Sequence, residues 1–236
     1  MKRKTVLIEN CESCPQRAKS TLCDLAGDQL GVFQKIKRSL QFEPHQTIFY
    51  EGHACLGLYL LCEGKVKLTR SSSRGQRQIV RILDGGELIE KHAFREGALH
   101  EVTCETLEPS QICLIEKEPY LALIRHNSDL ALKVIQLLSN ELGMHMDQLD
   151  QFTFKTARER LAGLLLELSD RFGKKVGKDI QVGIKLKREE VAEMAGITVE
   201  TAIRLLSSFR DEGLVDLDGR VITLLNQDRL ARIARH

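Results

Sequence analysis

Apolar residues in the middle third of the chain gather in short runs that are separated by turn residues such as Gly52, Gly64 and Gly85. The runs cover residues 47–50, 58–62, 66–69, 79–83, 102–107 and 112–115. Repeated β-branched and aromatic runs at this short spacing are typical of an antiparallel barrel or sandwich. A helical period over residues 28–40 precedes them. We therefore expect an antiparallel barrel or sandwich over 28–125, after a cysteine-bearing segment over 1–27.

A long helix is predicted from Asp129 to Phe152. Its apolar residues step alternately by four and three, which makes a heptad seam of about three repeats. The seam can pack on the chain's own barrel, but its regularity favours pairing with a second subunit. A polar member, His145, would then tune register. The predicted dimerisation helix covers 126–153, with a seam at Ile135, Leu138, Leu142, His145 and Leu149.

The remaining residues, 154–236, predict a winged helix-turn-helix. An amphipathic helix over 156–172 is followed by a strand over 180–186. Two short helices, 187–194 and 198–212, flank the turn at Gly196, and a hairpin is centred on Asp218-Gly219. The whole chain is accordingly predicted to be an α+β protein.

The second of these helices has an outward face that can read DNA. Arg204 can donate two hydrogen bonds to a guanine, and Glu200, one turn earlier, can accept from a cytosine and orient Arg204. An isolated Glu-x-x-x-Arg would be an ordinary surface ion pair. Inside a winged helix-turn-helix, it favours a base-reading role.

The rest of the predicted helix-turn-helix supports that face. Thr198 is the expected N-cap of the second helix, and Thr201 and Val199 share its exposed side. Arg188 is placed for a phosphate contact at the start of the first helix. The inward side is expected to carry Ile203, Leu206 and Phe209.

Composition adds little to this prediction. The 236 residues hold 35 Lys and Arg against 33 Asp and Glu, a net charge of +2. Residues 154–236 hold 16 against 13, which mildly favours an anionic partner for that half. No apolar run approaches the ~18 residues of a membrane span, and the apolar stretch after Lys2-Arg3-Lys4 is too short for a secretory signal. We expect a cytoplasmic protein with no membrane partner.

The seven cysteines carry more information. Their number is odd and no export signal accompanies them, so thiol chemistry or metal ligation is favoured over disulfides. Cys55, Cys62 and Cys104 fall in apolar runs and are expected to be small core residues.

In its order of barrel, long helix and winged module, the chain resembles the cyclic-AMP receptor/fumarate-nitrate regulator (Crp/Fnr) superfamily. The resemblance rests on the stretches 156–162 and 197–206, with the barrel stretch 57–67 also similar. It implies that residues 28–125 form an antiparallel, jelly-roll-like β-roll of the cyclic-nucleotide-binding-domain fold. It further implies a bacterial transcription regulator that works as a homodimer on palindromic double-stranded DNA. It also implies RNA polymerase as a partner.

The fumarate-nitrate branch implies oxygen or redox sensing through a 4Fe–4S cluster. Cys11, Cys14 and Cys23 resemble its three N-terminal ligands, and the run 107–113 matches its ligand strand, which favours Cys113 over Cys104 as the fourth. Eight residues separate Cys14 from Cys23, more than the usual spacing. Zinc binding, a redox-switched thiol pair and the absence of an effector therefore stay open.

Two other classes of function are disfavoured. Cyclic-nucleotide binding would need a ribose-binding Glu where Lys91 stands and a phosphate-binding Arg where only His100 or Glu101 stands. A redox enzyme or electron carrier using Cys11-x-x-Cys14 would need a substrate site, yet no catalytic arrangement or nucleotide loop is visible. We expect the chain not to be an enzyme.

Overall fold

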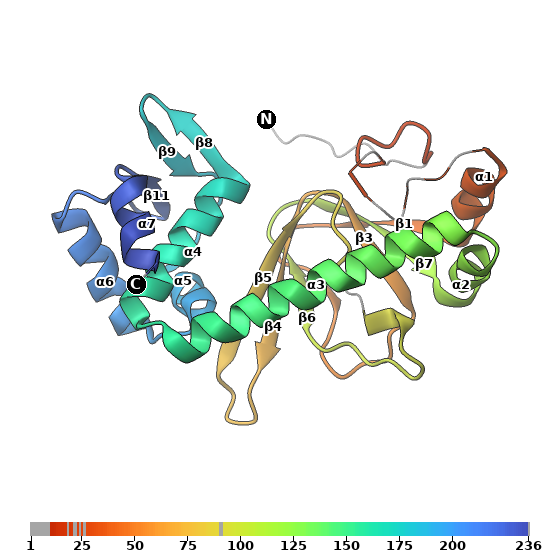
Figure 1. Cartoon of the computed structure of the whole chain (residues 1–236), viewed down its shortest axis with the longest axis horizontal. Helices are drawn as coiled ribbons and strands as arrows, with labels where there is room; N and C mark the ends of the chain where they lie inside the picture. The colour runs from red at the N-terminus through yellow and green to blue at the C-terminus, as the bar shows by residue number, and fades with distance from the viewer. Residues whose placement is uncertain are drawn as a thin grey trace. The chain divides into compact units, whose positions relative to one another are not determined.

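The computed structural model describes residues 10–17, 19, 20, 23, 25, 27–89 and 92–235, without the side chains of 92, 145 and 147–153. The side chains of His145 and Leu149, two members of the predicted seam, lie outside the described residues, as does Lys91. The chain divides into two compact units, Met1–Gly143 and Met144–His236 (Figure 1). Within the described residues, no helix is long and apolar enough to cross a membrane.

The first unit is built on two antiparallel sheets. Their orders are β1-β7-β3 and β2-β6-β4-β5. The strands are β1 (Lys37–Phe42), β2 (Thr47–Phe49), β3 (Gly57–Glu63), β4 (Lys65–Ser71), β5 (Arg77–Asp84), β6 (Thr103–Thr106) and β7 (Ser110–Glu116). The predicted antiparallel β-roll is confirmed.

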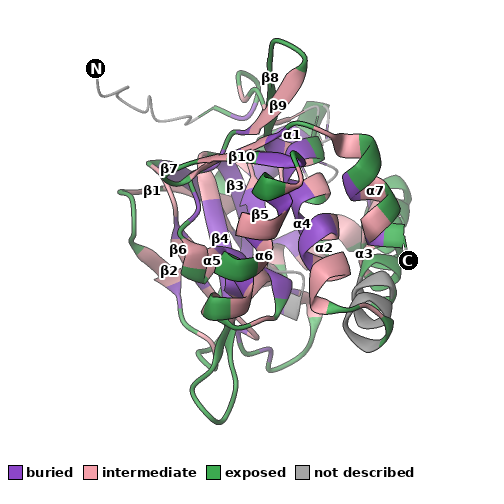
Figure 2. Ribbon diagram, turned by 90° about the vertical axis from the view of Figure 1, so that its left-hand side faces the viewer, coloured by how far each residue is buried: buried purple, intermediate pink, exposed green. Residues whose placement is uncertain are grey.

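Side-chain alternation along β3 divides the core of this unit into two clusters. Tyr59 and Leu61 pack between the sheets with residues of β2, β4, β5 and β6. Leu58, Leu60 and Cys62 point the other way, into a cluster completed by helices and the N-terminal segment. The buried positions are purple in Figure 2. Both faces of the three-stranded sheet are therefore covered.

Three helices contribute to the second cluster: α1 (Gly27–Ile36), α2 (Lys117–Arg125) and α3 (Ser128–Phe154). A short 3₁₀ turn, η2 (His92–Phe94), adds Ala93. Helix α3 buries Leu130 and Val134 there, at 1% and 7% exposure. Of the predicted seam residues, Ile135, Leu138 and Leu142 lie on another face of the helix and are exposed, at 58%, 37% and 65%.

The helix predicted over 28–40 is wrong at its C-terminal end. It stops at Ile36, and Lys37 opens β1, which pairs with β7 in the register Ser39↔Cys113 and Leu40↔Ile112. Leu40 fits a helical and a strand period equally well. The hydrogen bonds offered by β7 decide between them.

The second unit is a winged helix-turn-helix, as predicted. Its sheet has the order β10-β11-β9-β8. The elements are α4 (Ala157–Phe172), β8 (Gly173–Val176), β9 (Asp179–Val182), α5 (Arg188–Ala195), α6 (Val199–Asp211), β10 (Val215–Asp218), β11 (Val221–Leu224) and α7 (Gln227–Arg235).

Two parts of this unit differ from the prediction. The strand expected over 180–186 ends at Val182 and is the second strand of a hairpin that begins with β8. Helix α7 was not predicted at all. Asn226 caps it by accepting a hydrogen bond from the Arg229 backbone N–H at 3.0 Å, and the helix buries Leu230 and Ala234.

Candidate functional site

The start of α4 anchors the helix-turn-helix. Thr156 and Glu159 form a capping box, in which the Thr156 N–H donates to Glu159 Oε2 at 2.7 Å. One residue later, the Arg160 guanidinium donates to three backbone carbonyls. Its Nε reaches Ala195 O at 3.0 Å, its Nη2 reaches Gly196 O at 3.1 Å and its Nη1 reaches Lys155 O at 2.9 Å. Arg160 thus ties the turn between α5 and α6 to α4.

The turn itself depends on Gly196 and Thr198. Gly196 adopts a left-handed conformation, with φ 62°, and its N–H donates to Ala192 O. Thr198 is extended and its hydroxyl accepts from the Thr201 N–H at 3.2 Å, so it is the N-cap of α6. Both roles agree with the sequence prediction.

The outward face of α6 carries Glu200 and Arg204, which are exposed, and Val199 and Thr201, which are half-buried. Ala202, Leu206 and Phe209 bury the opposite face. Ile203 was expected on the buried face, and this is wrong: its side chain is 48% exposed. It lies one helical turn from Val199, so the face combines a guanidinium, a carboxylate and an apolar strip. The amphipathic period of α6 could have revealed this.

The Glu200 carboxylate interacts with groups at the N-terminus of its own helix. Its backbone N–H and the Thr198 hydroxyl hold the pKa of its carboxyl below the usual range. Among the residues that the structure describes, no ion pair joins Glu200 to Arg204, so the predicted orienting contact is not seen there. The Arg204 guanidinium and the Glu200 carboxylate are both at the surface.

Arg188 holds the wing. Its Nη2 donates to Gly219 O at 2.9 Å, in the turn between β10 and β11. Its Nη1 is buried and finds no partner among the described protein atoms. The sequence did not predict this contact inside the domain, and the phosphate contact expected of Arg188 stays a prediction.

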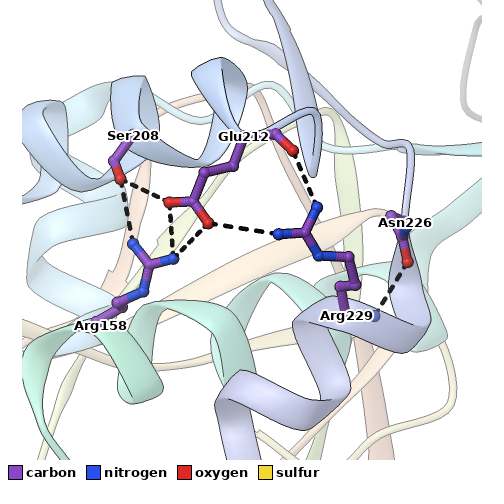
Figure 3. A network of polar contacts seen from close by, with 5 residues as sticks. All are labelled: Arg158, Ser208, Glu212, Asn226 and Arg229. Atoms are coloured by element: carbon purple, nitrogen blue, oxygen red, sulfur yellow. Dashed lines mark hydrogen bonds and ion pairs between the residues drawn. The ribbon is translucent and has the colours of Figure 1, made fainter.

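The C-terminal end of α6 is fixed by a polar network (Figure 3). Arg158 Nη2 donates to both carboxylate oxygens of Glu212 at 2.7 Å, and its Nη1 donates to Ser208 Oγ at 3.1 Å. Arg229 Nη1 donates to Glu212 O at 3.2 Å. A carboxylate at a helix C-terminus is unfavourable by itself, and the two guanidinium groups offset this. The network ties α6 to α4 and α7.

The first unit brings three of the four predicted ligand cysteines into one core. Cys11, Cys23 and Cys113 are buried in the second cluster, whereas Cys104 lies between the sheets. Cys14 is half-buried and its N–H donates to Cys11 O at 3.3 Å. Alternation along β7 accounts for the separation of Cys113 from the inter-sheet core, because Cys113 and Ile115 face the helices.

Cys62 also lies in this group, which the sequence analysis did not predict. It is a buried core residue as expected, but its Sγ lies 2.8 Å from Cys113 Sγ. Of the other two expected core cysteines, Cys104 is buried and Cys55 is half-buried in the loop before β3. Cys62 stands two positions from Leu60, which pairs with Cys113, and this placement could have revealed it.

Burial and neighbouring charge act in opposite directions on these thiols. Burial raises the pKa of Cys23 to about 12 and also raises that of Cys11. The hydrogen bond from Cys62 lowers the pKa of Cys113 to about 7, and the Lys37 ammonium adds to this. The same contact and burial raise the pKa of Cys62. Cys113 is therefore the thiol of this pair that ionises first.

The donor chemistry of the group fits an iron–sulfur cluster. Tyr120 is fully buried in the same core, and its hydroxyl has no hydrogen-bond partner in the described structure. Burial, and after it the charge of Cys23, raises the pKa of Tyr120. An orphaned donor beside several thiols fits sulfur acceptors that carry negative charge. Within the described residues, no three Cys, His, Asp or Glu side chains are already arranged to hold a metal ion.

The positions considered for a cyclic nucleotide are engaged within the barrel. His100 is buried and stacks on Phe49, with ring centroids 3.8 Å apart. Glu101 forms an ion pair with Arg95 at 3.1 Å. The Arg95 guanidinium beside this stretch thus already faces a carboxylate.

Comparison with known proteins agrees with both units. Residues 159–233 match the model of the Crp-like helix-turn-helix domain, and residues 39–127 match that of the cyclic nucleotide-binding domain. The "Fumarate and nitrate reduction regulatory protein" of Escherichia coli (strain K12) is 30% identical over 201 residues, which cover 85% of this chain and 80% of that protein. The corresponding protein of Klebsiella oxytoca is 30% identical over 199 residues, or 84% and 79%.

Solved structures show the same fold. FixK2 from Bradyrhizobium japonicum superposes with a TM-score of 0.73 at 24% identity, over 84% of this chain and 97% of that one. The global regulator CLP of Xanthomonas campestris gives a TM-score of 0.75 at 18% identity, over 84% and 99%.

Fold and helix-turn-helix together define a DNA-binding transcription regulator rather than an enzyme. More particularly, the chain belongs to the Crp/FNR family and is a homologue of the fumarate and nitrate reduction regulatory proteins. Regulators of this family bind DNA and act as dimers. The alternative of a redox enzyme is thereby set aside.

The network around Glu212 predicts a pH dependence of stability. Hydrogen bonds from Arg158 and Ser208 hold the pKa of Glu212 below its usual range, so its ionised form stabilises the folded state above about pH 4.3, the ordinary pKa. This contribution is lost as pH falls through the lowered pKa. Glu212→Gln should therefore unfold at lower urea concentration than the wild type at neutral pH, with the difference shrinking under acid.

Circular dichroism of the full-length protein in urea measures this. Glu167→Gln is the control, because its ion pair with Arg171, at 3.7 Å, is exposed and contributes little. Equal midpoints for wild type and Glu212→Gln at every pH would contradict the role given to the network.

Proposed function

We propose that this regulator binds a palindromic DNA site as a homodimer and reads it with the recognition helix 198–212. The observation that carries the proposal is the outward face of α6, where Arg204 and Glu200 are exposed on a helix whose other face is buried. Arg204 donates to guanine O6 and N7, and Glu200 accepts from cytosine N4. Ile203 and Val199 offer an apolar strip for a thymine methyl group.

The remaining predicted contacts position this helix. Thr198 and Thr201 lie at its N-terminus, where a phosphate is favoured by the helix dipole and by unpaired N–H groups. Arg188 holds the wing turn through one nitrogen and adds positive charge beside it. These residues set the register of the protein on DNA, while Arg204 and Glu200 supply the sequence preference.

The dimer is proposed to form along α3. Its two apolar faces have different tasks: Leu130 and Val134 pack into the sensor core, and Ile135, Leu138 and Leu142 are exposed. An exposed heptad seam on a helix already anchored by another face is suited to pairing with its copy. His145 and Leu149 continue the same seam in the sequence.

In this proposal, the segment 1–27 and the β-roll 28–125 sense the effector, the helix 126–153 joins two subunits, and 154–236 binds DNA. RNA polymerase is the further partner that the family implies. No cyclic nucleotide is proposed as the effector, because His100 and Glu101 offer a phosphate no guanidinium.

For the effector, we propose a 4Fe–4S cluster held by Cys11, Cys14, Cys23 and Cys113. Such a group supplies redox chemistry that responds to oxygen when bound. The protein contributes four thiolates from two segments, and the Tyr120 hydroxyl offers them a hydrogen bond. Because Cys113 lies on β7 and the others precede α1, binding would fix the N-terminal segment against the sheet that α3 covers.

DNA recognition is tested with Arg204→Ala. A lost bidentate contact costs about 1–3 kcal/mol of discrimination, so preference for the selected site over random DNA should fall roughly 10- to 100-fold per half-site. Fluorescence anisotropy with both duplexes measures the ratio. Arg210→Ala is the matched control, since Arg210 is an exposed arginine of the same helix that pairs with Asp211 at 3.2 Å. An Arg204→Ala protein with the wild-type ratio would contradict the proposal.

The dimer is tested with Leu142→Glu. Two carboxylates would face each other across the seam, so the protein should sediment as a monomer and bind the palindrome more weakly. Leu132→Glu is the control, because Leu132 is 58% exposed on the same helix but lies off the seam. Loss of the dimer in Leu132→Glu but not in Leu142→Glu would show that the seam is wrongly assigned.

The effector is tested by purification without oxygen. The wild type should contain about four iron and four sulfide per chain and absorb visible light near 400 nm, and Cys23→Ser should lose both. Cys104→Ser, which changes an equally buried thiol of the inter-sheet core, should retain them. A colourless, iron-free wild type that still binds DNA fully would end this part of the proposal.

Tyr120→Phe adds a second test, because it should stabilise the metal-free protein but destabilise the bound cluster. In the metal-free protein, it removes a buried hydroxyl without a partner and should raise the urea midpoint. In the iron-loaded protein, it removes a hydrogen-bond donor and should speed the loss of visible absorbance in air. A lowered midpoint in the metal-free protein would show that the hydroxyl already has a partner there.

A further inference from the structure

Two buried sulfur atoms meet between neighbouring strands of the sensor domain. Cys62, near the end of β3, and Cys113, in β7, are 1% and 5% exposed, and their Sγ atoms lie 2.8 Å apart. Cys62 has no place in the cluster ligand set proposed above.

The backbone is suited to a covalent bond between the two. Strands β3 and β7 are antiparallel neighbours, with Leu60 opposite Cys113, and the register shifts between Leu61 and Glu63, at Cys62. Bulges change strand twist locally and can bring a diagonal pair of side chains together. The sulfurs are already within about 1 Å of disulfide bonding distance.

We propose that Cys62 and Cys113 form a disulfide when the metal-free protein meets a hydroperoxide, and that this bond and metal binding at Cys113 exclude each other. The second half rests on the function proposed above. A sulfur bonded to another sulfur is no longer a thiolate, so the disulfide withdraws one of the four ligands. A reductant restores it.

The chemistry balances with one peroxide per thiol pair. The Cys113 sulfur attacks the terminal peroxide oxygen, so an S–O bond forms, the O–O bond breaks and the alkoxide leaves as alcohol after taking a proton. The Cys62 sulfur then attacks Cys113, so the S–S bond forms, the S–O bond breaks and water leaves with the Cys62 proton. Two thiols are oxidised to one disulfide and the hydroperoxide is reduced to an alcohol and water.

We place the first attack at Cys113 because its side chain is the more exposed of the two, at 5% against 1% for Cys62. The Ser39 hydroxyl oxygen lies 3.9 Å from Cys113 Sγ. Cys62 is then the nearest thiol to resolve the oxidised sulfur.

The test treats full-length, metal-free protein with hydrogen peroxide, alkylates the remaining thiols and maps the peptides by mass spectrometry. A peptide of β3 should be joined to a peptide of β7 through Cys62 and Cys113. Cys62→Ser should lose this link, and its Cys113 sulfenic acid should be trapped by dimedone. Cys62→Ala is the second variant should the serine perturb the core. Cys104→Ser, which changes an equally buried thiol on the other face, should keep the link.

Iron uptake separates this inference from the cluster proposal. Oxidised wild type should lose uptake of iron and sulfide, and dithiothreitol should restore it. If the link forms but the reduced protein takes up no iron, the disulfide stands and the cluster proposal fails. If iron is taken up but no link forms, or Cys113 joins Cys11, Cys14 or Cys23 instead, the disulfide is overturned.

Discussion

The Arg160 guanidinium, which binds three backbone carbonyls, is the contact on which the DNA-binding unit depends. Two of these carbonyls, from Ala195 and Gly196, belong to the turn between the helices and would otherwise face the surface as unpaired ends of α5. Because a guanidinium is planar and always charged, it fixes their directions as well as their positions. The direction of α6 follows, since Thr198 caps that helix two residues later. At the other end of α6, Arg158 donates hydrogen bonds to Glu212, so side chains of α4 fix the recognition helix near both of its ends.

In the first unit, the corresponding constraint is the two-residue period of a strand. It directs Cys62 and Cys113 to the helix-covered face of the three-stranded sheet and leaves Cys104 between the sheets. The face that receives Cys11 and Cys23 also receives Leu130 and Val134 of α3. The cysteine thiols and the anchoring residues of α3 therefore lie in one core. Metal binding or oxidation at these cysteines would therefore alter the packing of the core that holds α3 in place.

Local patterns in the sequence predicted the elements whose signals are local, and missed those that depend on distant partners. The heptad period of α3, the glycine turn at Gly196 and the Thr198 cap are all read within a few residues. The helix prediction was wrong at Leu40 because this residue pairs with Ile112 of β7, more than 70 residues away in the chain. The prediction that Ile203 is buried was wrong because helical spacing alone does not determine how wide the buried face of α6 is. The contact between Cys62 and Cys113 depends on a register shift that composition does not encode.

The central claim is that two recognition helices of one dimer read two half-sites that lie one turn of DNA apart. Binding to duplexes with altered spacing tests it most directly. A palindrome is first selected from random DNA with the full-length protein, and about 5 base pairs, half a helical turn, are then inserted between its halves. Because the insertion turns one half-site to the opposite side of the duplex, it should lower affinity at least to that of a single half-site. Equal affinity for both spacings, or for one isolated half-site, would contradict it.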